Sequence, residues 1–492
     1  MTSPQTVPKI CIALFCATLA LLIPLYLVSP QGAVLAIKHF GFWAMLSTLL
    51  LFLFALHTQC KHVTYSKVRK VARAHLPALL VILAATLYLH LHIDRGFKIL
   101  FDEYALNSTA MSFYFEDSAF VQAASHMLDG NVIASAGFVD KRPLFFPFIV
   151  SLCHKLTGYR PENVFWLNSG LTCVLLGILY RIVSQTCGKR HGILAVLLLT
   201  GLPLLAQNTT GGGYEIMNLC LISVLALSAN HYMRSPSSQG LNLVILASIL
   251  LANNRYESLL YVAVPVLLCG LKSLRSKQIQ LTWFAVFSPL LLMPPVFSFA
   301  IFRSDARFLQ TAGDNFFNLS HLPGNLTHAA AYLFETTGDY SNSALLSASG
   351  LIALLFLTIQ LIRRFRFFLS EDTALSTLVI TFLVALTTTT LALSCFWGQW
   401  TDPMTSRFSL PLQYFLAIAV PFALYYDFRL KNPPFYMPLI CVLFIIGFSS
   451  SHSARINNEA RMPTATGNDW AINWITHNLP TDHTLVIADA GV

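Results

Sequence analysis

The chain has 492 residues, of which 55% are hydrophobic and only 11% are charged, with a formal net charge of +9. A soluble domain carries roughly 25% charged residues, so this composition excludes a water-soluble globule of the same size. The positive charge does not indicate nucleic acid as a partner, because the basic residues form short clusters between long apolar blocks, as they do in cytoplasmic loops. The ten cysteines are scattered and form no C-x-x-C pair, which argues against a disulfide framework or a zinc site.

The apolar blocks predict an all-α polytopic membrane protein with about 13 transmembrane helices. Most blocks approach the roughly 20 residues that a helix needs to cross the hydrocarbon core, whereas the two between 241 and 271 are barely long enough. None shows the alternation of a membrane barrel. The apolar segment 144–158 is shorter, and we expect a re-entrant or interfacial helix there. The predicted spans are 9–29, 33–57, 76–93, 163–183, 192–207, 214–232, 241–253, 258–271, 282–302, 345–362, 374–394, 408–426 and 434–450.

The basic clusters predict the orientation of these spans. Segment 58–75 contains five Lys and Arg residues and no acid, and the later clusters at 189–190, 272–277 and 363–366 fall on the same side when thirteen spans are counted. Cytoplasmic loops carry such an excess of basic residues. We therefore expect a multi-pass protein of the cell inner membrane, with a cytoplasmic N-terminus and an external, periplasmic C-terminus. The larger polar segments then lie outside: 94–143, 303–344 and 451–492.

The first external segment contains the acidic pair Glu116-Asp117. We expect this pair to open an amphipathic helix that ends at Gly130. Acids in the first turn of a helix are favoured by the helix dipole, so the pair has a structural explanation. The functional alternative is a carboxylate that points into a cleft at the membrane surface. There it could act as a general base, or Asp117 could bind a divalent metal ion that carries positive charge.

Several short motifs resemble the GT-C membrane glycosyltransferases, the group that includes protein O-mannosyltransferases and the aminoarabinose transferase of lipid A. The acidic pair is followed by Arg142-Pro143-Leu144 and an apolar run, which is similar to the external loop of those enzymes. Their usual acidic order is Asp-Glu, whereas this pair is reversed. The resemblance implies that Asp117, or else Glu116, is the catalytic carboxylate. The pair Asp102-Glu103 has the family order and ranks third, because no Gly-terminated helix leads from it to the Pro motif.

Three further motifs fit the same resemblance and open predicted spans at the external face. They are Tyr214-Glu215 after Gly211 to Gly213, Arg255-Tyr256-Glu257, and Arg407-Phe-Ser-Leu-Pro411. Each alone could be an ionisable group that reaches water from the end of a span. Together with the acidic loop they favour a substrate site. The residues that the resemblance implies for substrate binding are Arg142, Glu215, Arg255, Glu257 and Arg407.

The resemblance implies a glycosyltransferase that takes a sugar from a polyprenyl-phosphate donor and passes it to a lipid, glycan or protein acceptor at the outer membrane face. It covers roughly 76–492. We expect two added helices and a basic loop in 1–75, a catalytic core in 76–450, and an external tail in 451–492, which reads as the start of a larger domain or as a segment docked on the outer loops. The alternatives are a transporter or flippase, for which similar halves with interrupted helices would be expected, and a non-catalytic scaffold.

Overall fold

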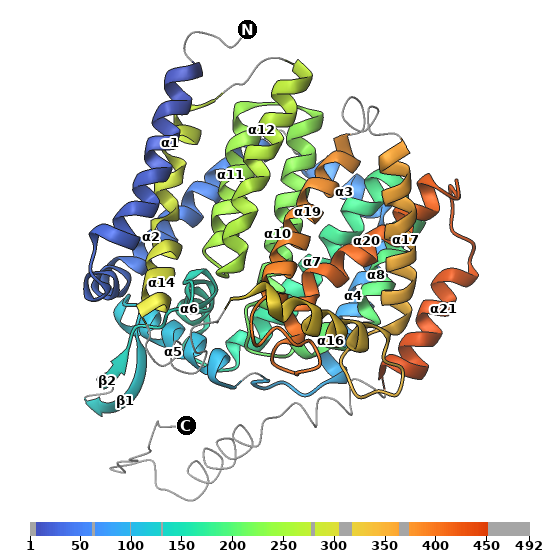
Figure 1. Ribbon diagram of the computed structural model, residues 1–492. Coiled ribbons are helices and arrows are strands. Elements are labelled where there is room, and N and C mark those ends of the chain that lie inside the picture. The colour runs from blue at the N-terminus through green and yellow to red at the C-terminus, as the bar shows by residue number, and fades with distance from the viewer. Residues whose placement is uncertain are drawn as a thin grey trace, which may run out of the picture.

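The computed structural model describes residues 6–61, 64–98, 100–128, 131–276, 281–304, 317–363 and 373–450. Within these ranges the protein is a helical bundle with one β-hairpin at one end (Figure 1). The predictions for the tail 451–492 concern residues outside the described ranges.

Eight helical segments of the described chain are long and apolar enough to cross a membrane, or up to ten if two bent helix pairs each form one span. This confirms a polytopic all-α protein, although the predicted count of thirteen spans is not reproduced. The long segments are α1 (Thr6–Leu22) with η1 (Ile23–Leu27), α2 (Pro30–Cys60), α7 (Asn163–Cys187), α10 (Glu215–Arg234), α13 (Trp283–Phe287) with η3 (Ser288–Leu292) and α14 (Met293–Ser304), α17 (Ala344–Arg363), α19 (Thr373–Leu393), and η6 (Ser406–Ser409) with α20 (Leu410–Tyr426).

The two bent pairs explain part of the difference in span count. The basic helix α3 (Tyr65–Ala74) meets α4 (Leu76–His92) at 76°, and α8 (Lys189–Thr200) meets α9 (Pro203–Thr209) at 79°. Pro203 opens α9 and cannot donate a backbone hydrogen bond to the preceding helix, so the predicted span 192–207 is broken there. Shorter helices complete the bundle: α6 (Phe145–Thr157), α11 (Ser238–Ala252), η2 (Glu257–Val262) with α12 (Ala263–Ser276), and α21 (Tyr436–Phe444) with η7 (Ile445–Ser449).

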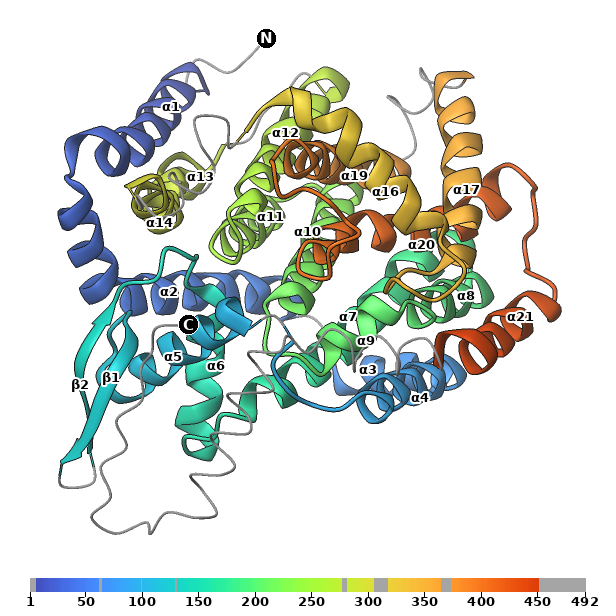
Figure 2. The same cartoon turned by 60° about the horizontal axis from the view of Figure 1, so that its bottom comes forward.

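The remaining elements gather at the end of the bundle that faces the viewer in Figure 2. They are α5 (Leu100–Glu116), β1 (Val121–Leu128), β2 (Asn131–Phe138), η5 (Leu319–His321) and α16 (Leu322–Phe334). The predicted helix after Glu116-Asp117 is wrong, because this segment forms β1, which pairs with β2 in antiparallel register from Val121–Phe138 to Leu128–Asn131. The helix precedes the acidic pair. Asp117 has a φ of 51°, a left-handed conformation that ends α5.

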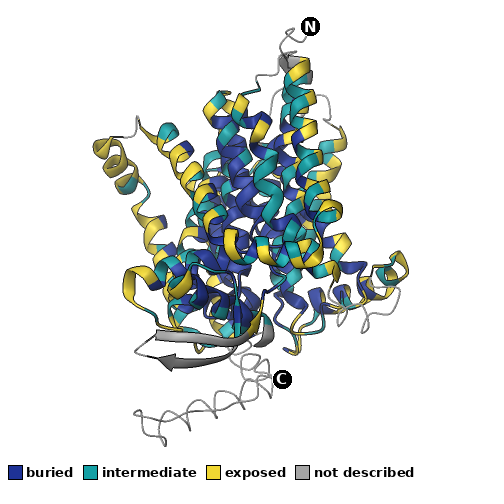
Figure 3. Ribbon diagram, turned by 90° about the vertical axis from the view of Figure 1, so that its left-hand side faces the viewer, coloured by how far each residue is buried: buried dark blue, intermediate teal, exposed yellow. Residues whose placement is uncertain are grey.

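Burial follows the pattern of a protein that sits in lipid. Buried residues concentrate in the middle of the bundle, and exposed residues cover its outside (Figure 3). Many of those exposed residues are large and apolar, including Leu14, Phe15, Leu83, Ile362 and Ile446. A soluble monomer rarely exposes so much contiguous apolar surface. The protein is therefore a multi-pass membrane protein, as the composition predicted.

Candidate active site

Seven ionisable side chains form a continuous chain of alternating charge near the end of the bundle that carries α5 and the β-hairpin. Arg142 contacts both Asp140, at 2.7 Å, and Asp102. Asp102 also contacts Arg407, whose other nitrogen donates to Glu215 at 3.0 Å. Glu215 lies 3.8 Å from Arg255, and Arg255 lies 2.6 Å from Glu257. We call this group the ionic cluster; its members are Asp102, Asp140, Arg142, Glu215, Arg255, Glu257 and Arg407.

The cluster forms where several helices begin. Asp102 lies in the first turn of α5, Glu215 is the first residue of α10, and Glu257 is the first residue of η2. Arg407 lies in η6, directly before α20. Backbone N–H groups at helix starts lack partners within the helix and favour negative charge. The same ends that stabilise these carboxylates can therefore also receive an anionic ligand.

Solvent access distinguishes the carboxylates of the cluster. The side chain of Asp102 is 21% exposed, whereas that of Glu215 is 1% exposed. Burial alone would raise the pKa of Asp102, but the guanidinium groups of Arg407 and Arg142 hold that pKa well below its usual range. Asp102 is therefore an ionised carboxylate that a ligand can reach. Glu215 is positioned instead to hold Arg407 and Arg255 in place.

Glu103, the neighbour of Asp102, faces the protein interior. It is 1% exposed and accepts a hydrogen bond of 2.7 Å from the backbone N–H of Lys98. Burial, and then the nearby charge of Glu215, raise its pKa, while hydrogen bonds from the backbone N–H groups of Lys98 and Gly212 oppose the rise; the result is about 7. Glu103 thus joins the start of α5 to the glycine-rich turn that precedes α10.

That turn places Glu215 in the cluster. The amide of Asn168 on α7 donates two hydrogen bonds of 2.8 Å, to the carbonyl oxygens of Gly211 and Gly213. A Cβ at Gly213 would lie 2.2 Å from a carboxylate oxygen of Glu215. A residue with a side chain at this position would therefore displace that carboxylate. The last of the three glycines before Tyr214-Glu215 therefore has a direct structural cause.

The structure brings together all five residues that were predicted to bind substrate: Arg142, Glu215, Arg255, Glu257 and Arg407. It places Glu116 and Asp117 elsewhere. Glu116 is exposed at the end of α5, and Asp117 pairs with Lys155 at 2.7 Å. Fifteen residues separate Asp117 from Asp102, which corresponds to roughly 20 Å along a helix. The carboxylate that meets the arginines is thus Asp102, which ranked third among the carboxylates predicted from the motifs.

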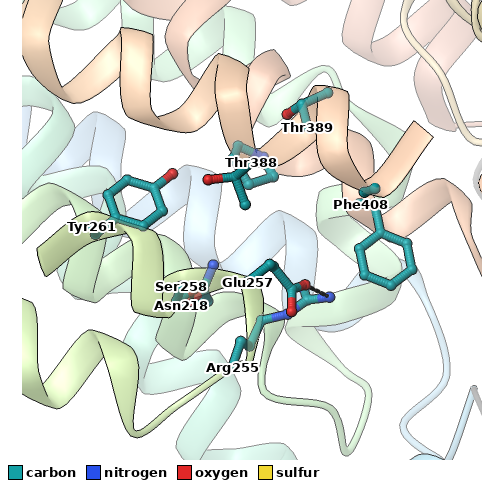
Figure 4. A pocket seen from close by; sticks show the side chains of 10 residues that line it. Asn218, Arg255, Glu257, Ser258, Tyr261, Thr388, Thr389 and Phe408 are labelled. Carbon is teal, nitrogen blue, oxygen red and sulfur yellow. Dashed lines mark hydrogen bonds and ion pairs between the residues drawn. The ribbon is translucent and has the colours of Figure 1, made fainter. Parts of the chain in front are cut away.

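A pocket extends from the cluster into the bundle (Figure 4). Arg255, Glu257 and Phe408 line it on the side of the cluster. The hydroxyl groups of Ser258 and Tyr261 and two threonines of α19 line the rest. The residues that line it are Asn218, Arg255, Glu257, Ser258, Tyr261, Thr388, Thr389, Ala392, Phe408 and Pro411.

The described residues do not fit a metal site at Asp117. Its carboxylate is occupied by Lys155, and among the described residues no three His, Cys, Asp or Glu side chains gather in a way that could hold a metal ion. The carboxylate of Asp102 is occupied by two guanidinium groups.

Comparison with known proteins gives a match between residues 141–299 and the family model of dolichyl-phosphate-mannose-protein mannosyltransferases. The matched segment includes Arg142, Glu215, Arg255 and Glu257. No curated protein sequence matches the chain.

The fold also matches solved structures. ArnT from Cupriavidus metallidurans bound to undecaprenyl phosphate aligns over 85% of this chain and 84% of its own, with a TM-score of 0.50 and 12% identity. The archaeal oligosaccharyltransferase AglB from Archaeoglobus fulgidus, in complex with an inhibitory peptide and a dolichol-phosphate, aligns over 83% of this chain with a TM-score of 0.45 and 12% identity. The chain spans 58% of the length of AglB. The family match and the ArnT fold confirm the predicted resemblance to GT-C membrane glycosyltransferases.

Proposed function

We propose that the protein transfers a sugar from a polyprenyl-phosphate-linked donor to an acceptor hydroxyl or amide at the outer face of the cytoplasmic membrane. The observation that carries this proposal is the reachable carboxylate of Asp102 between the guanidinium groups of Arg142 and Arg407. Sugar transfer from a phosphate needs a base for the acceptor proton and positive charge on the leaving phosphate. The ionic cluster offers both within contact distance.

We propose the following division of roles. The donor phosphate binds Arg407 or Arg142 and draws that guanidinium away from Asp102. This exchange raises the basicity of Asp102, because part of the positive charge that lowers its pKa now faces the phosphate. The acceptor oxygen or nitrogen attacks the anomeric carbon, the bond between that carbon and the phosphate oxygen breaks, and the acceptor proton moves to Asp102. Polyprenyl phosphate leaves with the bonding electron pair.

Asp102 replaces Asp117 and Glu116 as the proposed base. Guanidinium groups match phosphate oxygens in a bidentate manner, and the proposed mechanism requires the base and the phosphate to be neighbours. Asp117 has a lysine partner, but it lies roughly 20 Å along the helix from Asp102, the carboxylate that the arginines contact. Glu215 and Glu257 then position Arg407 and Arg255, and Arg255 also lines the pocket.

The proposed orientation places the ionic cluster on the periplasmic side of the inner membrane, with a cytoplasmic N-terminus and an external C-terminus. The basic segments 64–75, 189–190 and 363–366 support this orientation, because cytoplasmic loops carry an excess of Lys and Arg.

The test uses purified protein in proteoliposomes that contain undecaprenyl-phosphate-linked sugars. The sugars are mannose, glucose, galactose and 4-aminoarabinose, and the acceptors offered are lipid A, oligosaccharides and peptides. The proposal predicts release of undecaprenyl phosphate together with a glycosylated acceptor for at least one pair. A flippase would move the intact donor between leaflets and leave the bond between sugar and phosphate unbroken. Transport without cleavage across the whole panel would contradict the proposal.

A further inference from the structure

Helix α3 (Tyr65–Ala74) has no role in the proposed reaction, although its side chains are sharply divided into two faces. Lys67, Arg69, Lys70 and Arg73 alternate with apolar residues, and the helix contains no acid. At 100° per residue, Tyr65, Val68, Val71 and Ala72 share one side, and the four basic residues share the other. The four basic residues are exposed, as are Tyr65, Val68 and Val71. Such a pattern is typical of helices that lie in a membrane interface.

The position of α3 supports the same conclusion. None of its residues is buried, so its apolar side is left at least partly exposed in the described structure. It meets the apolar helix α4 at 76°, which turns α3 away from the direction of that helix. The end of α3 is fixed by a hydrogen bond of 2.7 Å from Lys189 to the carbonyl oxygen of Ala74. The hydrogen bond therefore attaches α3 to α8, at the end of α4, which is part of a candidate span.

We propose that α3 lies in the cytoplasmic leaflet and binds the phosphate groups of anionic phospholipids. Its apolar side chains enter the boundary of the acyl chains, and its basic side chains contact the headgroups. The charge of α3 favours anionic lipid as its binding partner. The ten residues of the helix include four basic side chains and no acidic one, which complements a surface of lipid phosphates. This surface is separate from the ionic cluster, so the inference does not depend on the proposed transfer reaction.

The experiment measures hydrogen–deuterium exchange of the full-length protein in nanodiscs. One set contains phosphatidylcholine alone, and the other contains equal parts of phosphatidylcholine and phosphatidylglycerol. We expect backbone exchange in 65–74 to be about tenfold slower in the anionic discs, because each basic residue near an anionic surface contributes to attraction. High salt should reduce this difference, since the attraction is screened.

Matched variants separate contact with anionic lipid from contact with protein. Replacing Lys67, Arg69, Lys70 and Arg73 with Gln should abolish the difference between the two lipid compositions. The control Arg234→Gln, Arg363→Gln removes exposed charges from the ends of α10 and α17 and should keep the difference. Val68→Ser, Val71→Ser should speed exchange in both discs. Equal exchange of the wild-type segment in the two discs would overturn the proposal. Equally strong protection in neutral detergent would also overturn it, because anionic lipid would then not be needed to protect α3.

Discussion

Asp102 and Arg407 are 305 residues apart in the chain and form a salt bridge at the end of the bundle that carries α5 and the β-hairpin. The bridge joins the first turn of α5 to the turn that precedes α20, and Arg407 continues it to Glu215 at the start of α10. Three helix starts are thereby fixed relative to one another by one guanidinium group. Loss of that group should therefore affect both the stability of the bundle and the chemistry of the site.

Arg407→Met should destabilise the protein by about 3–5 kcal/mol, because removing one member of a buried ion pair leaves the partner charge uncompensated. Glu215 is 1% exposed and would keep Arg255, at 3.8 Å, as its ion-pair partner among the described residues. The double variant Arg407→Met, Glu215→Met should recover part of the loss, since the buried charge is then absent as well. Unfolding of the detergent-solubilised protein measures both values. A double variant that is less stable than Arg407→Met would show that the pair is not the source of the effect.

Arg142→Gln should move the acidic limit of kcat/KM to higher pH. In the wild-type protein the guanidinium groups of Arg407 and Arg142 hold the pKa of Asp102 below its usual range, although burial alone would raise it. The carboxylate therefore stays ionised well into acidic solution. With Arg142 removed, the pKa rises and protonation begins at higher pH. The pH profile of kcat/KM reports groups of the free enzyme. An unchanged acidic limit in the variant would contradict the role assigned to Asp102.

The titration of Glu103 should lower the stability of the folded protein as the pH rises from about 4.5 to about 7. Burial raises the pKa of this carboxyl group to about 7 in the folded protein. The protonated form is thus favoured by folding, and its contribution is fully present below the ordinary pKa and lost as the pH passes the raised value. Glu103→Gln keeps an acceptor for the N–H of Lys98 and removes the titration. Melting temperatures at pH 5 and pH 8 should differ more for the wild type than for this variant. The same dependence in both proteins would place the titrating group elsewhere.

The topology predicts that a reporter fused after Arg69 is cytoplasmic and that one fused after Glu335 is external. Arg69 belongs to the basic helix α3, and Glu335 follows α16 at the end of the bundle that contains α5 and the hairpin. Alkaline phosphatase and a fluorescent protein report the two sides. The same side for both fusions would invalidate the proposed orientation.

Much of the fold and the arginine-rich part of the site could be predicted from local signals. Long apolar blocks define the spans, and Glu215, Arg255 and Arg407 were found because each begins a span beside a recognisable motif. The position of Asp102 beside two arginines could not be predicted, because Arg142 and Arg407 contact it from distant parts of the chain. The segment 121–128 was misread as a helix, since a short run of small residues fits both periods and its strand partner determines the outcome.

The central claim is tested most directly by the transfer rates of Asp102→Asn and Asp117→Asn, measured with the same polyprenyl-phosphate sugar donor and acceptor. Asp102→Asn removes the proposed base and should lower kcat by a factor of about 10² or more, the usual contribution of a general base. Asp117→Asn breaks only the partly exposed contact with Lys155 and should keep turnover close to that of the wild type. Near-wild-type turnover by Asp102→Asn, together with an inactive Asp117→Asn, would contradict the account and return the catalytic role to Asp117.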